Sequence, residues 1–83
     1  MEGKMSTLDE LRQIAGLENG PAAELANDLL VFQEQYDTGQ LDKEEYQFLI
    51  SQIAEVRAAQ ELADDEIACR KIVAAAEGLL AVL

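Results

Sequence analysis

Apolar residues recur at spacings of three and four along most of the chain, which is the period of an amphipathic helix. One such stripe follows Pro21, a residue suited to the first position of a helix. Its apolar members are Ala22, Leu25, Ala26, Leu29, Phe32 and Tyr36. The pattern predicts a helix from Pro21 to about Asp37, ended by Gly39 in a left-handed conformation.

A further helix is predicted to begin directly after Asp42. Asp42 and Glu45 have the spacing of a capping box, and Leu41 and Tyr46 occupy the positions of a hydrophobic staple. Because the link from the preceding helix is short, the two helices are expected to form an antiparallel hairpin. The expected inner face consists of Tyr46, Leu49, Ile50, Ile53 and Val56.

The run from Leu41 to Glu77 contains neither glycine nor proline, so it forms either one long helix or two. Consecutive aspartates are poor residues inside a helix and good residues at its start. We therefore favour a break near Ala63-Asp64-Asp65, followed by a last helix over Glu66–Val82.

A short helix over Leu8–Ala15 is expected at the other end, because Thr7 and Glu10 have capping-box spacing. Gly16 and the stretch Glu18-Asn19-Gly20-Pro21 would end it. The predicted fold is all-α, an up-and-down bundle of three main helices with a short N-terminal helix. Residues 1–6 are expected to be a flexible leader, and residues 7–83 a single helical domain.

The charge is strongly unbalanced, with 17 acidic and 6 basic residues among 83 and a net charge of −11. Nucleic-acid phosphates and anionic membranes would be repelled, so neither is expected as a direct partner. No apolar run approaches the roughly 20 residues of a membrane span. No secretory signal is visible, and one cysteine cannot form an internal disulfide, so the expected compartment is the cytoplasm.

The chain lacks histidine, and it has neither a glycine-rich phosphate loop nor a calcium-binding loop. We therefore expect no enzyme, no cofactor and no metal, and name no catalytic residue. Acidic clusters at Asp42–Glu45 and Asp64–Glu66 either complement helix dipoles or, at the second cluster, form a weak divalent-cation site. Cys69 is either a small buried apolar residue or a reactive thiol beside Arg70 and Lys71.

The C-terminal segment from Gly78 is apolar to its last residue. These side chains either close the core of the domain or form an exposed patch that pairs with a second copy or another protein. The predicted interaction surface consists of Ile72, Val73, Leu79, Leu80, Val82 and Leu83.

The stretch Tyr36–Leu49 resembles the short helical hairpin family called SHOCT. Its matching residues are Gly39, Leu41, Asp42, Glu44, Glu45 and Tyr46. The resemblance implies a helical hairpin associated with oligomerisation.

Together these features predict a non-enzymatic protein-interaction domain, a small accessory subunit of bacterial or phage type. Its partner would be itself, as a homo-oligomer, or a protein in a larger assembly. The alternative is an acidic inhibitor or nucleic-acid mimic that blocks a basic groove on a partner enzyme.

Overall fold

All regular elements are helical in the part of the chain that the computed structural model describes, residues 3–17 and 20–83. The predicted all-α class is therefore confirmed. The elements are α1 (Gly3–Leu17), α2 (Pro21–Asp37), α3 (Lys43–Gln52), the π-helical turn η1 (Ile53–Arg57), α4 (Ala58–Glu61) and α5 (Glu66–Ala81).

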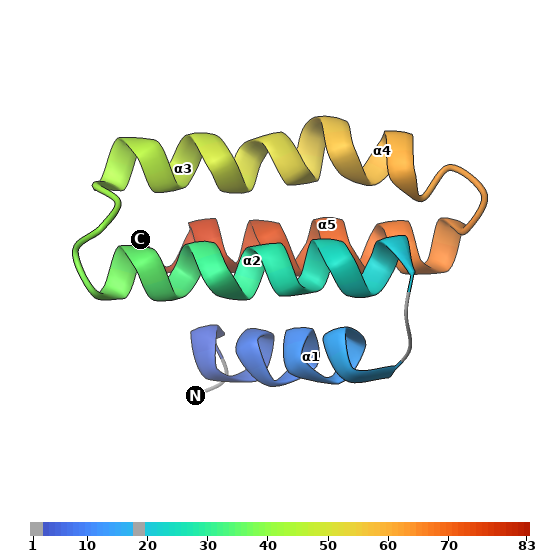
Figure 1. Ribbon diagram of the computed structural model, residues 1–83, viewed down its shortest axis with the longest axis horizontal. Helices are drawn as coiled ribbons and strands as arrows, with labels where there is room; N and C mark the ends of the chain where they lie inside the picture. Colours follow the sequence, from blue (N-terminus) through green and yellow to red (C-terminus); the bar gives the residue numbers. More distant parts are fainter. Residues whose placement is uncertain (1–2, 18–19) are drawn as a thin grey trace.

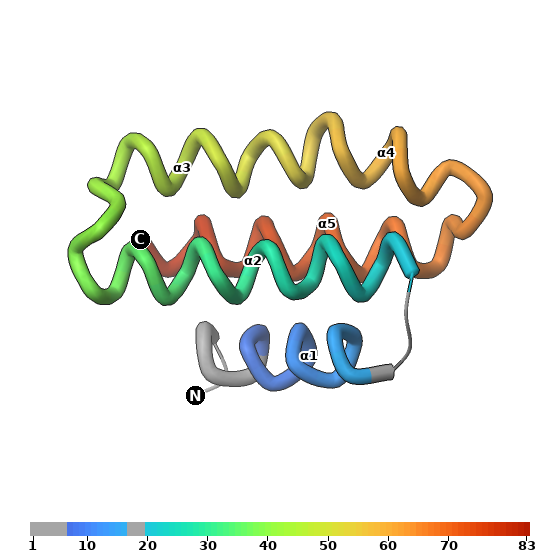
Figure 2. The backbone as a smooth tube through the Cα atoms, viewed as in Figure 1, coloured from blue at the N-terminus to red at the C-terminus, as the bar shows by residue number. Residues whose placement is uncertain are grey.

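The helices lie side by side, and the direction alternates from α1 to α2, to the run α3–η1–α4, and to α5 (Figure 1). The helix formed by α3, η1 and α4 is one continuous rod (Figure 2). α5 packs against every other helix, whereas α1 packs only against α2 and α5 among the described elements. α2 also packs against every other element, so α2 and α5 together form the centre of the bundle, and one broad side of α3–η1–α4 faces away from it.

The hairpin between α2 and α3 is built by local hydrogen bonds. Gly39 has a φ of 84°, and the N–H of Gln40 donates to the carbonyl of Gln35 at 2.7 Å, as in a Schellman motif. At the start of α3 the N–H of Glu45 donates to Asp42 Oδ1 at 2.8 Å, and the N–H of Asp42 donates to Glu45 Oε1 at 3.0 Å. The left-handed glycine and the capping box were both predicted and are both confirmed.

The predicted break near the consecutive aspartates is also confirmed. α4 ends at Glu61, and Asp65 caps α5 by accepting a hydrogen bond from the N–H of Ala68 at 3.1 Å. Because Asp65 satisfies an N–H that has no partner within the helix, it favours a new helix start over a continuous helix.

The π-helical turn changes which residues of the long helix face inward. The buried positions are Tyr46, Ile50, Ile53, Ala58 and Leu62. Their spacings are four, three, five and four, and the spacing of five falls on η1. A regular helix would bring residue 57 inward after residue 53. The extra residue of the π turn brings Ala58 inward instead and leaves Val56, expected inside, 41% exposed.

The first helix is longer than expected. It has 15 residues and begins at Gly3, so Thr7 lies within it and not at its N-cap, and part of the expected leader is helical. Leu8 and Leu11 enter the core. Thr7 packs closely on α5, since a β-carbon at Gly78 would lie only 2.9 Å from Thr7 Oγ1. The predicted turn at Glu18-Asn19 and residues 1–2 lie outside the described residues.

Candidate interaction surface

The predicted C-terminal surface is mostly used by the domain itself. Ile72 and Leu79 are completely buried, and Val73, Leu80 and Leu83 are partly buried and pack against the core. Only Val82, at 47%, counts among the exposed large apolar side chains of the described residues. The assignment of Ile72 and Leu79 to a surface was therefore wrong. The reason is that α5 is in contact with every other helix, so its apolar stripe closes the core.

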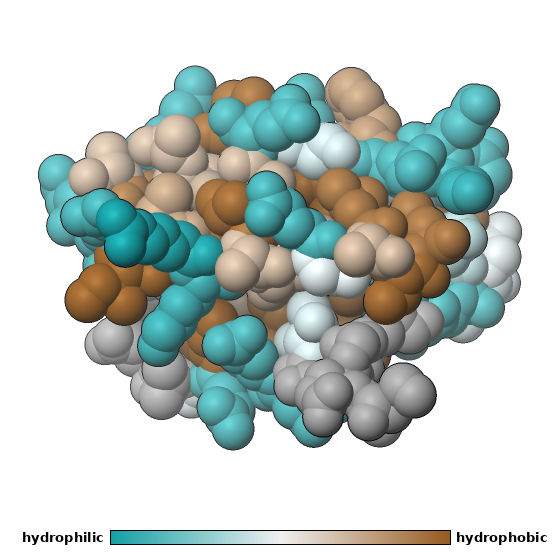
Figure 3. Space-filling view, turned by 180° about the vertical axis from the view of Figure 1, so that it is seen from behind, coloured by the Kyte–Doolittle hydropathy of each residue, from teal (hydrophilic) through white to brown (hydrophobic). Residues whose placement is uncertain are grey.

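The side of the molecule that carries α5 shows no continuous apolar face. Hydrophilic side chains divide its apolar surface into separate areas (Figure 3). One of these apolar areas lies at the end of the bundle where the C-terminus lies. Ile67, at the other end of α5, is exposed. Ile67 lies in the first turn of α5 and Val82 directly follows its last residue, so the two exposed side chains are 15 positions apart and cannot form one patch.

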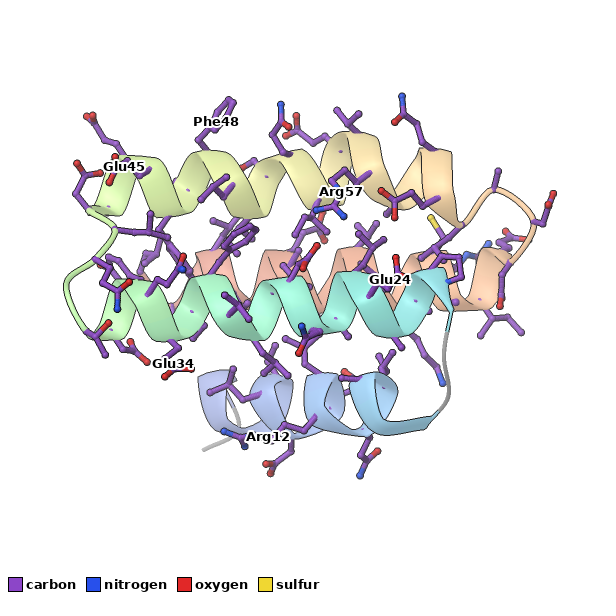
Figure 4. The ribbon with its side chains drawn as sticks, viewed as in Figure 1. Arg12, Glu24, Glu34, Glu45, Phe48 and Arg57 are labelled. Carbon is purple, nitrogen blue, oxygen red and sulfur yellow. The ribbon has the colours of Figure 1, made fainter. Side chains whose placement is uncertain are left out.

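The outward side of α3–η1–α4 carries a stripe that sequence reasoning missed. Phe48 is 62% exposed and points away from the bundle (Figure 4). The stripe continues through Gln52, Val56 and Gln60, all exposed. Each of the four lies two positions from a buried residue, and two residues of a helix subtend about 200°. The outer stripe, defined as Phe48, Gln52, Val56 and Gln60, therefore lies opposite the core.

The π turn keeps this stripe straight. In a regular α-helix a spacing of four drifts by about 40° at each step, so three steps would carry the stripe about 120° around the helix. A π turn rotates the chain less per residue than an α-helix does. The step from Gln52 to Val56 runs through η1, so it reduces the total drift of the stripe. The same turn therefore sets the register of the core and of the outer stripe.

The outer stripe has little charge around it. From Gln47 to Gln60 the only charged residues are Glu55 and Arg57. Arg57 turns toward α2, where its Nη1 lies 2.9 Å from Asp28 Oδ2, and its Nε donates to Glu61 Oε2 at 3.0 Å. The hydrogen bond to Glu61 is the main reason that the pKa of Arg57 lies above its ordinary value; Asp28 adds to the rise and burial opposes it.

The opposite side of α3 holds a buried polar network. The hydroxyl of Tyr46 donates to Gln33 Oε1, and Gln33 Nε2 donates to Asp37 Oδ1 at 2.8 Å. The rings of Tyr46 and Tyr36 stack with their centroids 4.5 Å apart. Burial is the main reason that the pKa of Tyr46 lies above its ordinary value, and nearby Asp37 adds to it. This network joins α2 to α3 and fixes the orientation of the helix that carries the outer stripe.

A hollow of about 500 Å³ lies at the end of the bundle where α4 meets α5. Its lining includes the apolar residues Pro21, Leu62 and Ile67 and the carboxylates Asp64 and Asp65. Asp65 already caps α5. Within the described part of the chain, no group of three or more histidine, cysteine or acidic side chains is placed to hold a metal ion.

Cys69 is partly buried and packs against the core, as the apolar interpretation of this residue expected. In the described residues there is no helix long and apolar enough to span a membrane. Comparisons with protein-family models, with curated proteins and with solved structures find no match to this chain. The SHOCT resemblance over Tyr36–Leu49 therefore stays a prediction.

Proposed function

We propose that this chain is a non-enzymatic protein-interaction domain that associates with itself, as a small subunit of an assembly. In this proposal it is an up-and-down bundle of three main helices, α2, α3–η1–α4 and α5, with α1 along one side. The observation that carries the proposal is Phe48, a large aromatic side chain that is 62% exposed on the outward side of the bundle.

An aromatic side chain in this position contributes little to the fold. It lies opposite the buried positions of its own helix, so only a contact outside the domain could remove more of its side chain from water. Burial of a phenylalanine side chain is worth about 1.5–3 kcal/mol. A domain of this size buries a limited core, so association that covers Phe48 and Val56 would add stability that the monomer lacks.

Light scattering over a concentration series tests the proposal. We expect the mass to rise above the 9.1 kDa of one chain as concentration increases. Two valines provide a matched pair, since Val56 is 41% exposed on the outer stripe and Val31 is 40% exposed on α2. Val56→Gln and Phe48→Gln should each weaken association at least about tenfold, whereas Val31→Gln should not.

A monomeric mass at every concentration would contradict self-association. Equal losses from Val56→Gln and Val31→Gln would contradict the assignment to the outer stripe. Far-ultraviolet circular dichroism of each variant shows that the helices remain. Both valines are partly exposed, so the folded domain tolerates the exchange at either position.

The alternative function, an acidic inhibitor that occupies a basic groove on an enzyme, is favoured by one feature. Glu61, Asp64 and Asp65 border the hollow at the end of α4 together with one basic residue, Lys71, and Ile67 is exposed there. Salt separates the two functions, because it screens repulsion between two acidic copies and screens attraction between an acidic and a basic protein. Added salt should strengthen contact between two acidic copies and should weaken binding to a basic protein.

A further inference from the structure

We infer that the outer stripe is a two-fold symmetric interface, on which a second copy of this chain lies antiparallel with the symmetry axis at Gln52. This inference rests on the proposed self-association and specifies its surface and geometry. In the antiparallel pairing Gln52 meets its own copy, and Phe48 meets Val56 of the second copy. At the two ends of the stripe Gln60 meets Glu44 of the second copy.

Charge indicates which occupant fits the outer stripe. The domain has a net charge of −11, and a second copy has the same charge. Two copies therefore repel each other wherever carboxylates would meet, and they approach at least cost where carboxylates are few. The outer stripe has no charged member; beside it Glu55 is the one exposed carboxylate between Gln47 and Gln60, and Arg57 is directed toward Asp28 and Glu61. A basic protein would instead favour the acidic surfaces elsewhere.

The polar members of the stripe are glutamines, which suit contact with an identical surface. A glutamine amide carries both hydrogen-bond donors and acceptors, so it can pair with another glutamine amide. A two-fold interface requires this property, because residues at the axis face their own copies. Gln52 meets the requirement at the axis, where an aspartate or a lysine would face a like charge.

The acidic start of α3 decides between antiparallel and parallel packing. Glu44 lies four positions before Phe48, one turn earlier and about 40° around the helix from it, so it borders the stripe at its N-terminal end. Parallel packing would place Glu44 beside Glu44 of the second copy. Antiparallel packing places it beside Gln60, whose amide can donate to the carboxylate. It also aligns the two helix dipoles favourably.

The contact is small, since it uses one helix from each copy. It falls at the low end of interface sizes, below about 1,200 Å² in total, where complexes are weak or transient. We therefore expect association at high protein concentration, strengthened by salt, because salt screens the repulsion between the two acidic copies.

Directed disulfide exchange tests the geometry. In a Cys69→Ala background, a chain with Gln60→Cys is activated with Ellman's reagent and mixed with a reduced chain carrying one new cysteine. The attacking thiolate forms the disulfide, and thionitrobenzoate leaves and is measured by its absorbance. The reduced partners are Glu44→Cys for antiparallel packing, Gln60→Cys for parallel packing, and Glu34→Cys, exposed on α2, as the random-collision control.

We expect exchange with Glu44→Cys to be at least about tenfold faster than with Gln60→Cys or Glu34→Cys, and activated Gln52→Cys to react equally fast with its own reduced form. All these positions are exposed, so the variants keep the core. Faster exchange between two Gln60→Cys chains would overturn the antiparallel geometry. If every pair reacts only as fast as the Glu34→Cys control while light scattering shows a dimer, this surface is overturned and the proposed self-association stands. A monomeric protein would overturn both.

Discussion

A single-residue deletion in the π turn tests how the long helix reaches the core on both sides of η1. Deleting Glu55 reduces the spacing between the buried residues Ile53 and Ala58 from five to four, which a regular α-helix accommodates. Every buried side chain of this helix keeps its inward direction. Glu55 itself is exposed. We therefore expect the deletion to change the free energy of unfolding by less than about 1 kcal/mol, as is typical of exposed positions.

The matched control deletes Ser51, four positions earlier in the same helix. The spacing between Ile50 and Ile53 then falls from three to two, which points Ile53 away from the core. The helix can recover only by turning Ala54 inward in place of Ile53, since Ala54 and Ala58 are four positions apart. The cost is then similar to that of an isoleucine-to-alanine exchange in a core, about 2–5 kcal/mol.

Urea unfolding followed by circular dichroism measures both deletions. The total stability expected for a chain of this length is roughly 4–12 kcal/mol, so deletion of Ser51 removes a large part of it, and deletion of Glu55 should not. Equal destabilisation by the two deletions would refute the view that η1 corrects the register of the core.

Four further results are expected. Tyr46→Phe removes the hydroxyl that donates to buried Gln33, and should lower the free energy of unfolding by about 1–3 kcal/mol in urea titrations. The pKa of Tyr46 in the fold lies above its ordinary value of 10.0. The neutral Tyr46 hydroxyl therefore stabilises the fold fully below pH 10, and this stabilisation is lost as the pH rises further. The free energy of unfolding of the wild type should fall more steeply above pH 10 than that of Tyr46→Phe. Gly78→Ala places a β-carbon 2.9 Å from Thr7 Oγ1 and should lower the melting temperature. Gly16→Ala, whose added β-carbon would meet no side chain or other segment within 4 Å, should raise it.

The parts of the fold that the sequence predicted well are those decided by neighbouring residues. The capping box at Asp42, the left-handed Gly39 and the Asp65 cap each depend on hydrogen bonds within five residues. Such bonds form with little help from the rest of the chain, so the residue types at fixed spacings are sufficient evidence. The antiparallel hairpin of α2 and α3 follows from them.

The parts that were missed depend on contacts between distant segments. Thr7 has the spacing of a helix cap, yet its place is set by Gly78, more than 70 positions away. Val56 fits a regular helical stripe, and only the packing of Ala58 and Leu62 turns it outward. Alanine and leucine at these positions carry no signal that distinguishes an inward from an outward residue.

The candidate surface was misplaced for a related reason. Apolar composition at the C-terminal segment does not tell whether a helix is central or peripheral in the bundle. α5 packs against every other element of the bundle, as α2 does, so Ile72 and Leu79 are core residues. Phe48 was recognisable in principle, because it lies two positions from both Tyr46 and Ile50, and a helix cannot bury all three on one side.

The core and the outer stripe are opposite sides of one helix, so their registers cannot vary independently. A residue added or removed within η1 shifts the residues beyond it on both sides together. After deletion of Glu55 the spacings of the outer stripe become four, three and four, which still places Phe48 and Val56 opposite the core. Association should then survive with the fold. If the fold survives and association does not, the shape of the π turn is itself part of the contact with the second copy.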